Sequence, residues 1–99
     1  SCTHYGKYFI GDQTELKSGD WISVHGGYNV NYVAENPMLL VPLDAFHKHM
    51  EEGHFASLHP YVYSLSGNQT TKGDSQRMAR EILADLRNDG VDAVIVGST

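Results

Sequence analysis

The sequence predicts a small α/β fold, in which a partly parallel sheet carries flanking helices and an antiparallel ribbon at its N-terminal end. Three observations predict this class. Residues 74–99 combine a helical pattern with an apolar run directly after it, which is typical of an inner parallel strand. Residues 42–65 repeat the order helix then strand, and residues 21–33 alternate as two half-buried strands do. The second half therefore predicts parallel pairing with a right-handed crossover.

Length and composition limit the class of protein. With 99 residues, of which 40% are hydrophobic and 19% charged, we expect a single globular α/β domain over residues 1–99. A net charge of -5 argues against nucleic acid or an anionic membrane as partner, since both require clustered Lys and Arg. No apolar run approaches the roughly 20 residues that span a bilayer. A single cysteine makes no internal disulfide, so a cytoplasmic protein is expected.

The first half of the chain predicts strands. Residues 5–10 carry aromatic and β-branched side chains and indicate a first strand. Residues 21–25 and 28–33 each alternate, which predicts two more strands joined as a hairpin through Gly26 and Gly27. These strands would form the antiparallel ribbon.

The second half predicts two helices, each followed by a strand. Pro42 suits the first turn of a helix that Gly53 ends, and residues 61–65 read as the next strand. A second helix is expected to begin at Asp74 or Ser75, and Gly90 suits its left-handed cap. Its apolar face comprises Met78, Ile82, Leu83 and Leu86. Residues 91–96, which are apolar except for Asp92, then predict a strand covered on both faces.

Cys2 is the main candidate for a reactive residue. A lone cysteine is often a small apolar core residue. Its polar neighbours Ser1, Thr3 and His4 favour instead a reactive segment, because a nearby histidine helps to form the thiolate. A thiolate can attack the carbonyl of residue 1, and elimination from the resulting thioester would leave a pyruvoyl group that forms an imine with an amine. Spacing alone leaves both readings open.

Two glycine-containing segments are candidate binding sites. Gly26 and Gly27 can turn backbone N–H groups toward an anion, with His25 as acid or base, although a plain tight hairpin has the same sequence. Ser98 and Thr99 follow the last predicted strand, and chemistry in open α/β sheets sits just past the carboxyl ends of strands.

The histidines of the second half do not match a metal-binding spacing. His47 and His49 lie about 200° apart on a helix and so face opposite ways. The sequence has no H-E-x-x-H or C-x-x-C pattern, and the expectation is that it binds no metal.

Several segments, taken in order, resemble a known family. Residues 2–7 (CTHYGK), 19–28 (GDWISVHGGY) and 90–99 (GVDAVIVGST) are similar to the pyruvoyl-bearing proproteins of the reductases for D-proline and for glycine, sarcosine and betaine. Residues 58–64 (LHPYVYS) and the helix from Ser75 fit as well. The resemblance covers the whole chain but only part of a family protein, in the N-terminal part of the region after cleavage.

The resemblance implies an amino-acid reductase subunit in which Cys2 is the precursor of the pyruvoyl cofactor. The amine substrate would form an imine there, and a selenol or thiol on a partner subunit would break the C–N bond, in an oligomeric assembly. We add His4 and His25 as proton-transfer candidates. The substrate-binding candidates are Gly26, Gly27, Ser98 and Thr99.

Two departures leave other functions open. Ser1 still precedes Cys2, and the chain holds no second cysteine. The alternative is a non-catalytic α/β binding or assembly domain in which Cys2 stays unprocessed. A thiol-redox module based on Cys2 is a weaker third reading, because a resolving cysteine is missing from this sequence.

Overall fold

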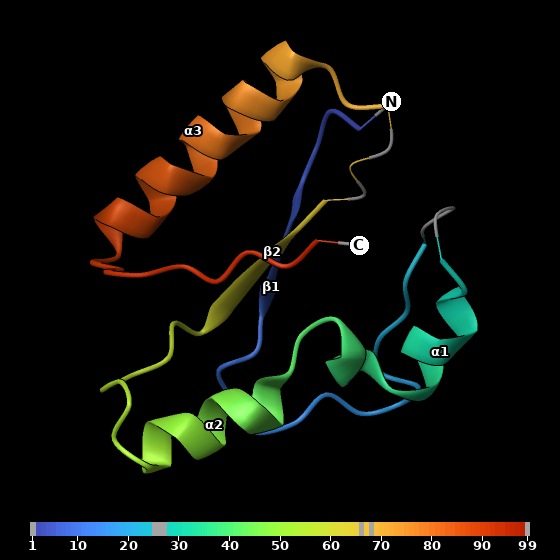
Figure 1. Ribbon diagram of the computed structural model, residues 1–99. Helices are drawn as coiled ribbons and strands as arrows, with labels where there is room; N and C mark the ends of the chain where they lie inside the picture. Colours follow the sequence, from blue (N-terminus) through green and yellow to red (C-terminus); the bar gives the residue numbers. More distant parts are fainter. Residues whose placement is uncertain (1, 25–27, 66, 68, 99) are drawn as a thin grey trace.

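The computed structural model describes residues 2–24, 28–65, 67 and 69–98 (Figure 1). The elements are, in order, β1 (Gly6–Phe9), α1 (Val30–Glu35), the 3-10 helix η1 (Pro37–Leu39), α2 (Leu43–Glu51), β2 (Tyr61–Ser64) and α3 (Lys72–Asn88). The prediction of a mixed α/β fold is confirmed. No helix among the described residues is both long and apolar enough to cross a membrane.

The sheet in the described part of the chain is an antiparallel pair, β1 with β2. Gly6 lies opposite Ser64, and Phe9 lies opposite Tyr61. The Phe9 and Tyr61 rings meet edge to face with their centroids 5.4 Å apart, a cross-strand contact that helps to fix the register. An antiparallel ribbon was predicted, but between other segments, and the prediction of a partly parallel sheet is wrong.

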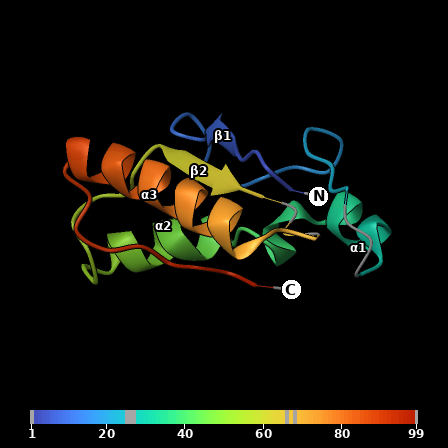
Figure 2. The same ribbon diagram turned by 90° about the horizontal axis from the view of Figure 1, so that it is seen from above.

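Residues 91–98 show why the parallel sheet is absent. They turn back from the end of α3 and run in the reverse direction as an extended segment, outside any described strand (Figure 1 and Figure 2). Three of their apolar side chains face solvent, with Val94, Ile95 and Val96 59%, 76% and 85% exposed. The apolar run has the composition of an inner strand, but β1 and β2 pair with each other and not with it.

The predicted strands over residues 21–25 and 28–33 are also wrong. Trp21 forms an isolated bridge with Ser18, and residues 22–24 continue outside regular structure. Asn29 instead caps a helix, because its side chain accepts a hydrogen bond from the Asn31 backbone N–H at 3.1 Å. In α1 the buried Val33 follows Val30 by three residues, which is helical spacing. The predicted turn at residues 25–27 lies outside the described residues.

The two predicted helices of the second half are confirmed as α2 and α3. Gly53 and Gly90 have φ angles of 83° and 74°, the left-handed conformation expected at helix ends. The start of α3 differs from the prediction, since Thr71 is the N-cap. The Thr71 hydroxyl accepts a hydrogen bond from the Asp74 backbone N–H at 3.1 Å. The helix therefore begins at Lys72, before the predicted Asp74 or Ser75.

The main core lies where the loop after β1 meets α2. Leu43, at the start of α2, is 0% exposed and packs with Ile10 and Leu16. Half-buried apolar side chains surround these three, namely Trp21, Met38, Val41, Phe46, Leu58 and Val62. Met78 and Leu86 are the buried residues of α3. The cluster holds the loop after β1 against α2, which fixes the end of β1.

A polar network joins the ribbon to α3. The Lys7 ammonium of β1 donates to the Asp85 carboxylate at 2.8 Å and lies 4.5 Å from the Tyr61 ring centroid. The Tyr63 hydroxyl of β2 donates to the same carboxylate oxygen. The Lys7 contact, followed by that of Tyr63, holds the pKa of Asp85 below its usual value. Hydrogen bonding to Asp85 raises the pKa of Lys7. Burial raises the pKa of Tyr63, and the hydrogen bond to Asp85 raises it further.

This network predicts a pH-dependent contribution to stability. A carboxyl whose pKa is lowered by folding stabilises the fold above its unfolded pKa, and that contribution is lost as the pH falls through its folded pKa. Asp85→Asn should therefore lower the urea midpoint at pH 7, and its difference from wild type should shrink between about pH 5 and pH 2. Circular dichroism across that range measures both.

The control is Asp92→Asn, because Asp92 is exposed. It should leave the midpoint unchanged at every pH. An Asp85→Asn difference that is constant with pH would show that the carboxylate charge does not hold α3 to the ribbon.

Candidate functional site

The candidate site is the N-terminal segment, residues 2–5, which leads into β1 beside the first half of α3 (Figure 1). The Arg77 guanidinium of α3 donates a hydrogen bond to the Thr3 backbone carbonyl. Arg77 also pairs with Glu81, one helical turn on, at 3.2 Å. Because Arg77 is itself held by a carboxylate on its own helix, it fixes the N-terminal segment against α3.

Cys2 and His4 lie in this segment. The Cys2 side chain is buried, with 8% of the residue exposed, and its thiol donates to the His4 backbone carbonyl at 3.4 Å. The exposed His4 imidazole places Nδ1 2.8 Å from the Thr3 hydroxyl oxygen. The thiol thus contacts the backbone of His4, while the imidazole contacts Thr3.

Tyr5 closes the site on the side of the ribbon. Its ring centroid lies 6.1 Å from that of Tyr63. Burial raises the pKa of the Tyr5 hydroxyl, and Glu81 on α3 raises it further. A phenol with a raised pKa stays protonated at neutral pH, so Tyr5 can donate a hydrogen bond but is a poor base.

The other predicted site residues are not gathered around Cys2. His25, Gly26, Gly27 and Thr99 lie outside the described residues. Ser98 is exposed and belongs to the extended segment that follows α3. That segment runs toward a point away from the N-terminal segment in both views (Figure 1 and Figure 2). Of the predicted residues that the structure describes, only Cys2 and His4 lie together.

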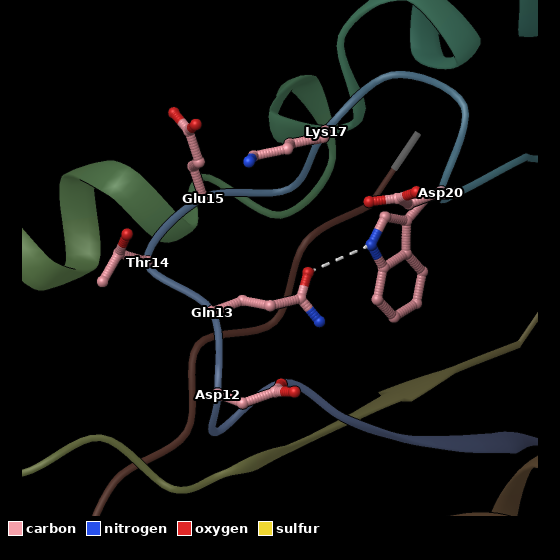
Figure 3. A pocket seen from close by; sticks show the side chains of 7 residues that line it. Asp12, Gln13, Thr14, Glu15, Lys17 and Asp20 are labelled. Carbon is pink, nitrogen blue, oxygen red and sulfur yellow. Dashed lines mark hydrogen bonds between the residues drawn. The ribbon is translucent and has the colours of Figure 1, made fainter.

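A separate open hollow of about 530 Å³ lies on the loop after β1 (Figure 3). The Trp21 indole donates to the Gln13 side-chain oxygen at 3.4 Å, a hydrogen bond that the dashed line marks in Figure 3. The remaining lining residues are Asp12, Thr14, Glu15, Lys17 and Asp20. Three carboxylates against one ammonium favour a cation over an anion in this hollow.

Sequence reasoning missed Arg77, Glu81 and Tyr5 as parts of the site. Arg77 and Glu81 read as the solvent face of a helix, and their i, i+4 spacing predicts only their mutual ion pair. The contact between Arg77 and Thr3 joins positions 74 residues apart, which no local pattern encodes. The residues that line the hollow were likewise interpreted as a polar loop, so the hollow was not predicted.

The fold and the site define a mixed α/β domain that presents a buried thiol next to a histidine on a segment held by its longest described helix. The model of the family glycine/sarcosine/betaine reductase selenoprotein B matches residues 1–99. The chain belongs to this family.

Curated relatives agree with the family match. The chain is 39% identical to the glycine reductase complex component B subunit gamma of Peptoclostridium acidaminophilum, over 100% of this chain and 23% of the relative. It is 36% identical to the betaine reductase complex component B subunit beta and 36% identical to the sarcosine reductase complex component B subunit beta of the same organism, with the same coverage. The chain thus spans about a quarter of the length of these relatives. No solved structure matches.

Proposed function

We propose that this protein contributes to component B of an amino-acid reductase that cleaves the C–N bond of a glycine-type substrate. The observation that carries the proposal is the family match over residues 1–99, together with relatives named for glycine, sarcosine and betaine reductase complexes. Those three compounds share a carboxymethyl group on nitrogen and differ only in their N-methyl groups. One reaction therefore serves all three, in which the bond from nitrogen to the α-carbon breaks and the amine leaves.

The proposed partner is a reductase subunit that carries a selenol or thiol. Its attack on the α-carbon forms a Se–C or S–C bond while the C–N bond breaks, and the amine takes up a proton. A dithiol then breaks the Se–C or S–C bond and is oxidised to a disulfide. Its two electrons leave with the carboxymethyl group, which takes up a proton to become acetate, and the selenol or thiol is regenerated. This chemistry needs reduced thiols, which supports a cytoplasmic location. The relatives' names, which describe components of complexes, support an oligomeric assembly.

We further propose that Cys2 supplies a pyruvoyl group. Its thiolate would attack the carbonyl of residue 1 and break the peptide bond between residues 1 and 2, which leaves a thioester and a free amine on residue 2. Elimination would then break the Cβ–S bond, release residue 1 as a thiocarboxylate and leave a dehydroalanine. Tautomerisation and hydrolysis of that group by water would release ammonia and leave the ketone. The position of Cys2 beside His4 supports this step.

The alternative function is a binding or assembly domain with an unprocessed Cys2. The burial of Cys2 and the hydrogen bond from its thiol to a backbone carbonyl favour this alternative, since a structural cysteine has such surroundings.

Two measurements on the natural complex test the proposal. With a dithiol reductant, the amine released should be ammonia from glycine, methylamine from sarcosine or trimethylamine from betaine. Release of none of them would overturn the reductase function.

The intact mass, before and after cyanoborohydride reduction with a small amine, tests the pyruvoyl step. A chain that begins at residue 2, lighter than its cysteine form, should gain the mass of the amine less that of the carbonyl oxygen, which leaves as water. An unmodified chain without an adduct would leave Cys2 unprocessed.

A further inference from the structure

The C-terminal end of α2 brings three potential metal ligands together. The His54 backbone N–H donates to the His49 carbonyl, and the Gly53 N–H donates to the Met50 carbonyl, both at 3.0 Å. This pair of hydrogen bonds is the Schellman arrangement, which reverses the chain and places the side chains at its two ends against each other. An apolar pair usually occupies those two positions. Here they hold two histidines, with Glu52 between them in the sequence.

The ligand atoms of His49, Glu52 and His54 converge. A Glu52 carboxylate oxygen lies 3.7 Å from His49 Nδ1 and 3.4 Å from His54 Nε2. The two rings meet edge to face with their centroids 5.1 Å apart, and the three ligand atoms lie within 4.8 Å of one another. Donors that bind one tetrahedral Zn²⁺ at about 2.0–2.2 Å are about 3.4 Å apart. Both nitrogen–oxygen distances are therefore close to those of a bound set.

We propose that His49, Glu52 and His54 form a surface site for a divalent transition metal ion, with Zn²⁺ as the fitting ion. Two imidazoles and one carboxylate are a donor set that suits Zn²⁺ and Ni²⁺, whereas Mg²⁺ prefers oxygen ligands alone. The side chains are 55%, 45% and 61% exposed, so an ion reaches them from solvent and keeps a position for water.

The fold explains why the histidine spacing did not reveal this site. His47 lies on another face of α2, with its Nε2 3.1 Å from the Gln13 carbonyl oxygen. His47 and His49 therefore do face different ways, as their spacing predicts. His54 reaches His49 because Gly53, with φ 83°, turns the chain back after the helix. A rule that counts helical turns does not include this reversal.

The test is the amount of Zn²⁺ bound per chain at micromolar free Zn²⁺, measured by equilibrium dialysis and elemental analysis of the natural protein. Wild type should hold one more equivalent than His49→Gln, Glu52→Gln or His54→Gln, whose affinity at this site should fall at least about 10-fold. Ni²⁺ should compete for that equivalent and Mg²⁺ should not. Glu51→Gln is the matched control, since it removes a neighbouring carboxylate of α2 outside the set.

Circular dichroism of each variant shows whether α2 is still folded, so that loss of metal and loss of structure are separated. The triple variant His49→Gln, Glu52→Gln, His54→Gln decides the proposal. If it binds as much Zn²⁺ as wild type, these side chains do not form a metal site. Equal loss in Glu51→Gln, or displacement of Zn²⁺ by Mg²⁺, would overturn the proposal as well, because either would indicate non-specific attraction to acidic groups.

Discussion

Leu43→Ala is expected to lower the free energy of unfolding by about 2–5 kcal/mol. Leu43 is 0% exposed and lies at the centre of the cluster with Ile10 and Leu16. The substitution removes buried methyl and methylene groups, and the surrounding side chains come from several segments that cannot close the cavity together. Since domains of this size have only about 5–15 kcal/mol of stability in total, this one change removes a large fraction of it.

Urea unfolding followed by circular dichroism measures the effect. Leu39→Ala is the matched control, because Leu39 is 60% exposed in the adjoining helix η1 and the same atoms are removed. It should change the free energy of unfolding by about 0.5 kcal/mol or less. If both variants lose the same stability, the core does not centre on Leu43.

Local sequence predicted the helices α2 and α3. Gly53 and Gly90 end α2 and α3 in the left-handed conformation, as their positions suggested. These signals act within one or two turns of the chain. The N-cap of α3 was misplaced because Thr71, Asp74 and Ser75 are all good caps, and only the structure shows that Thr71 is the one used.

The strands predicted over residues 5–10 and 61–65 are present as β1 and β2, but their pairing could not be predicted, because it depends on distant partners. β1 pairs with β2, so that Gly6 lies opposite Ser64, across more than half of the chain. Side chains of residues 28–33 alternate as those of a strand do, but Asn29 is the N-cap of α1, so the residues after it are helical. Residues 91–96 have the composition of an inner strand, but β-propensity describes a fit to a packed surface, and here Ile95 faces solvent.

The same limit applies to the candidate site. Cys2 and His4 were predicted together because they are two residues apart. Arg77, which holds their segment, was not found, because its contact with Thr3 arises only when α3 packs beside the N-terminal segment. Reactive residues that are close in sequence can be predicted from the sequence alone. The distant residues that position them can be identified only from the structure.

Cys2→Ala should abolish the carbonyl adduct, because no nucleophile remains to form the pyruvoyl group. Under the proposed mechanism it should also lower the rate of amine release at least about 100-fold. Cys2→Ser keeps a nucleophilic oxygen at the same position, but a hydroxyl is far less ionised than a thiol at neutral pH. The serine variant should therefore form the carbonyl slowly and fall between wild type and Cys2→Ala. Intact mass after cyanoborohydride reduction and an amine-release assay measure the two effects.

A purely structural role for Cys2 gives a different pattern. Cys2 is 8% exposed, so its truncation costs on the order of 1 kcal/mol of stability whatever its chemistry. If Cys2 only packs, both variants should release amine at the wild-type rate and differ only in their urea midpoints.

His4→Gln tests the proposed proton transfer by His4. The glutamine retains an amide that can contact the Thr3 hydroxyl, but it removes the imidazole base. Under the proposed mechanism carbonyl formation should therefore slow, while the urea midpoint stays unchanged. Unchanged carbonyl formation in His4→Gln would assign proton transfer to another group.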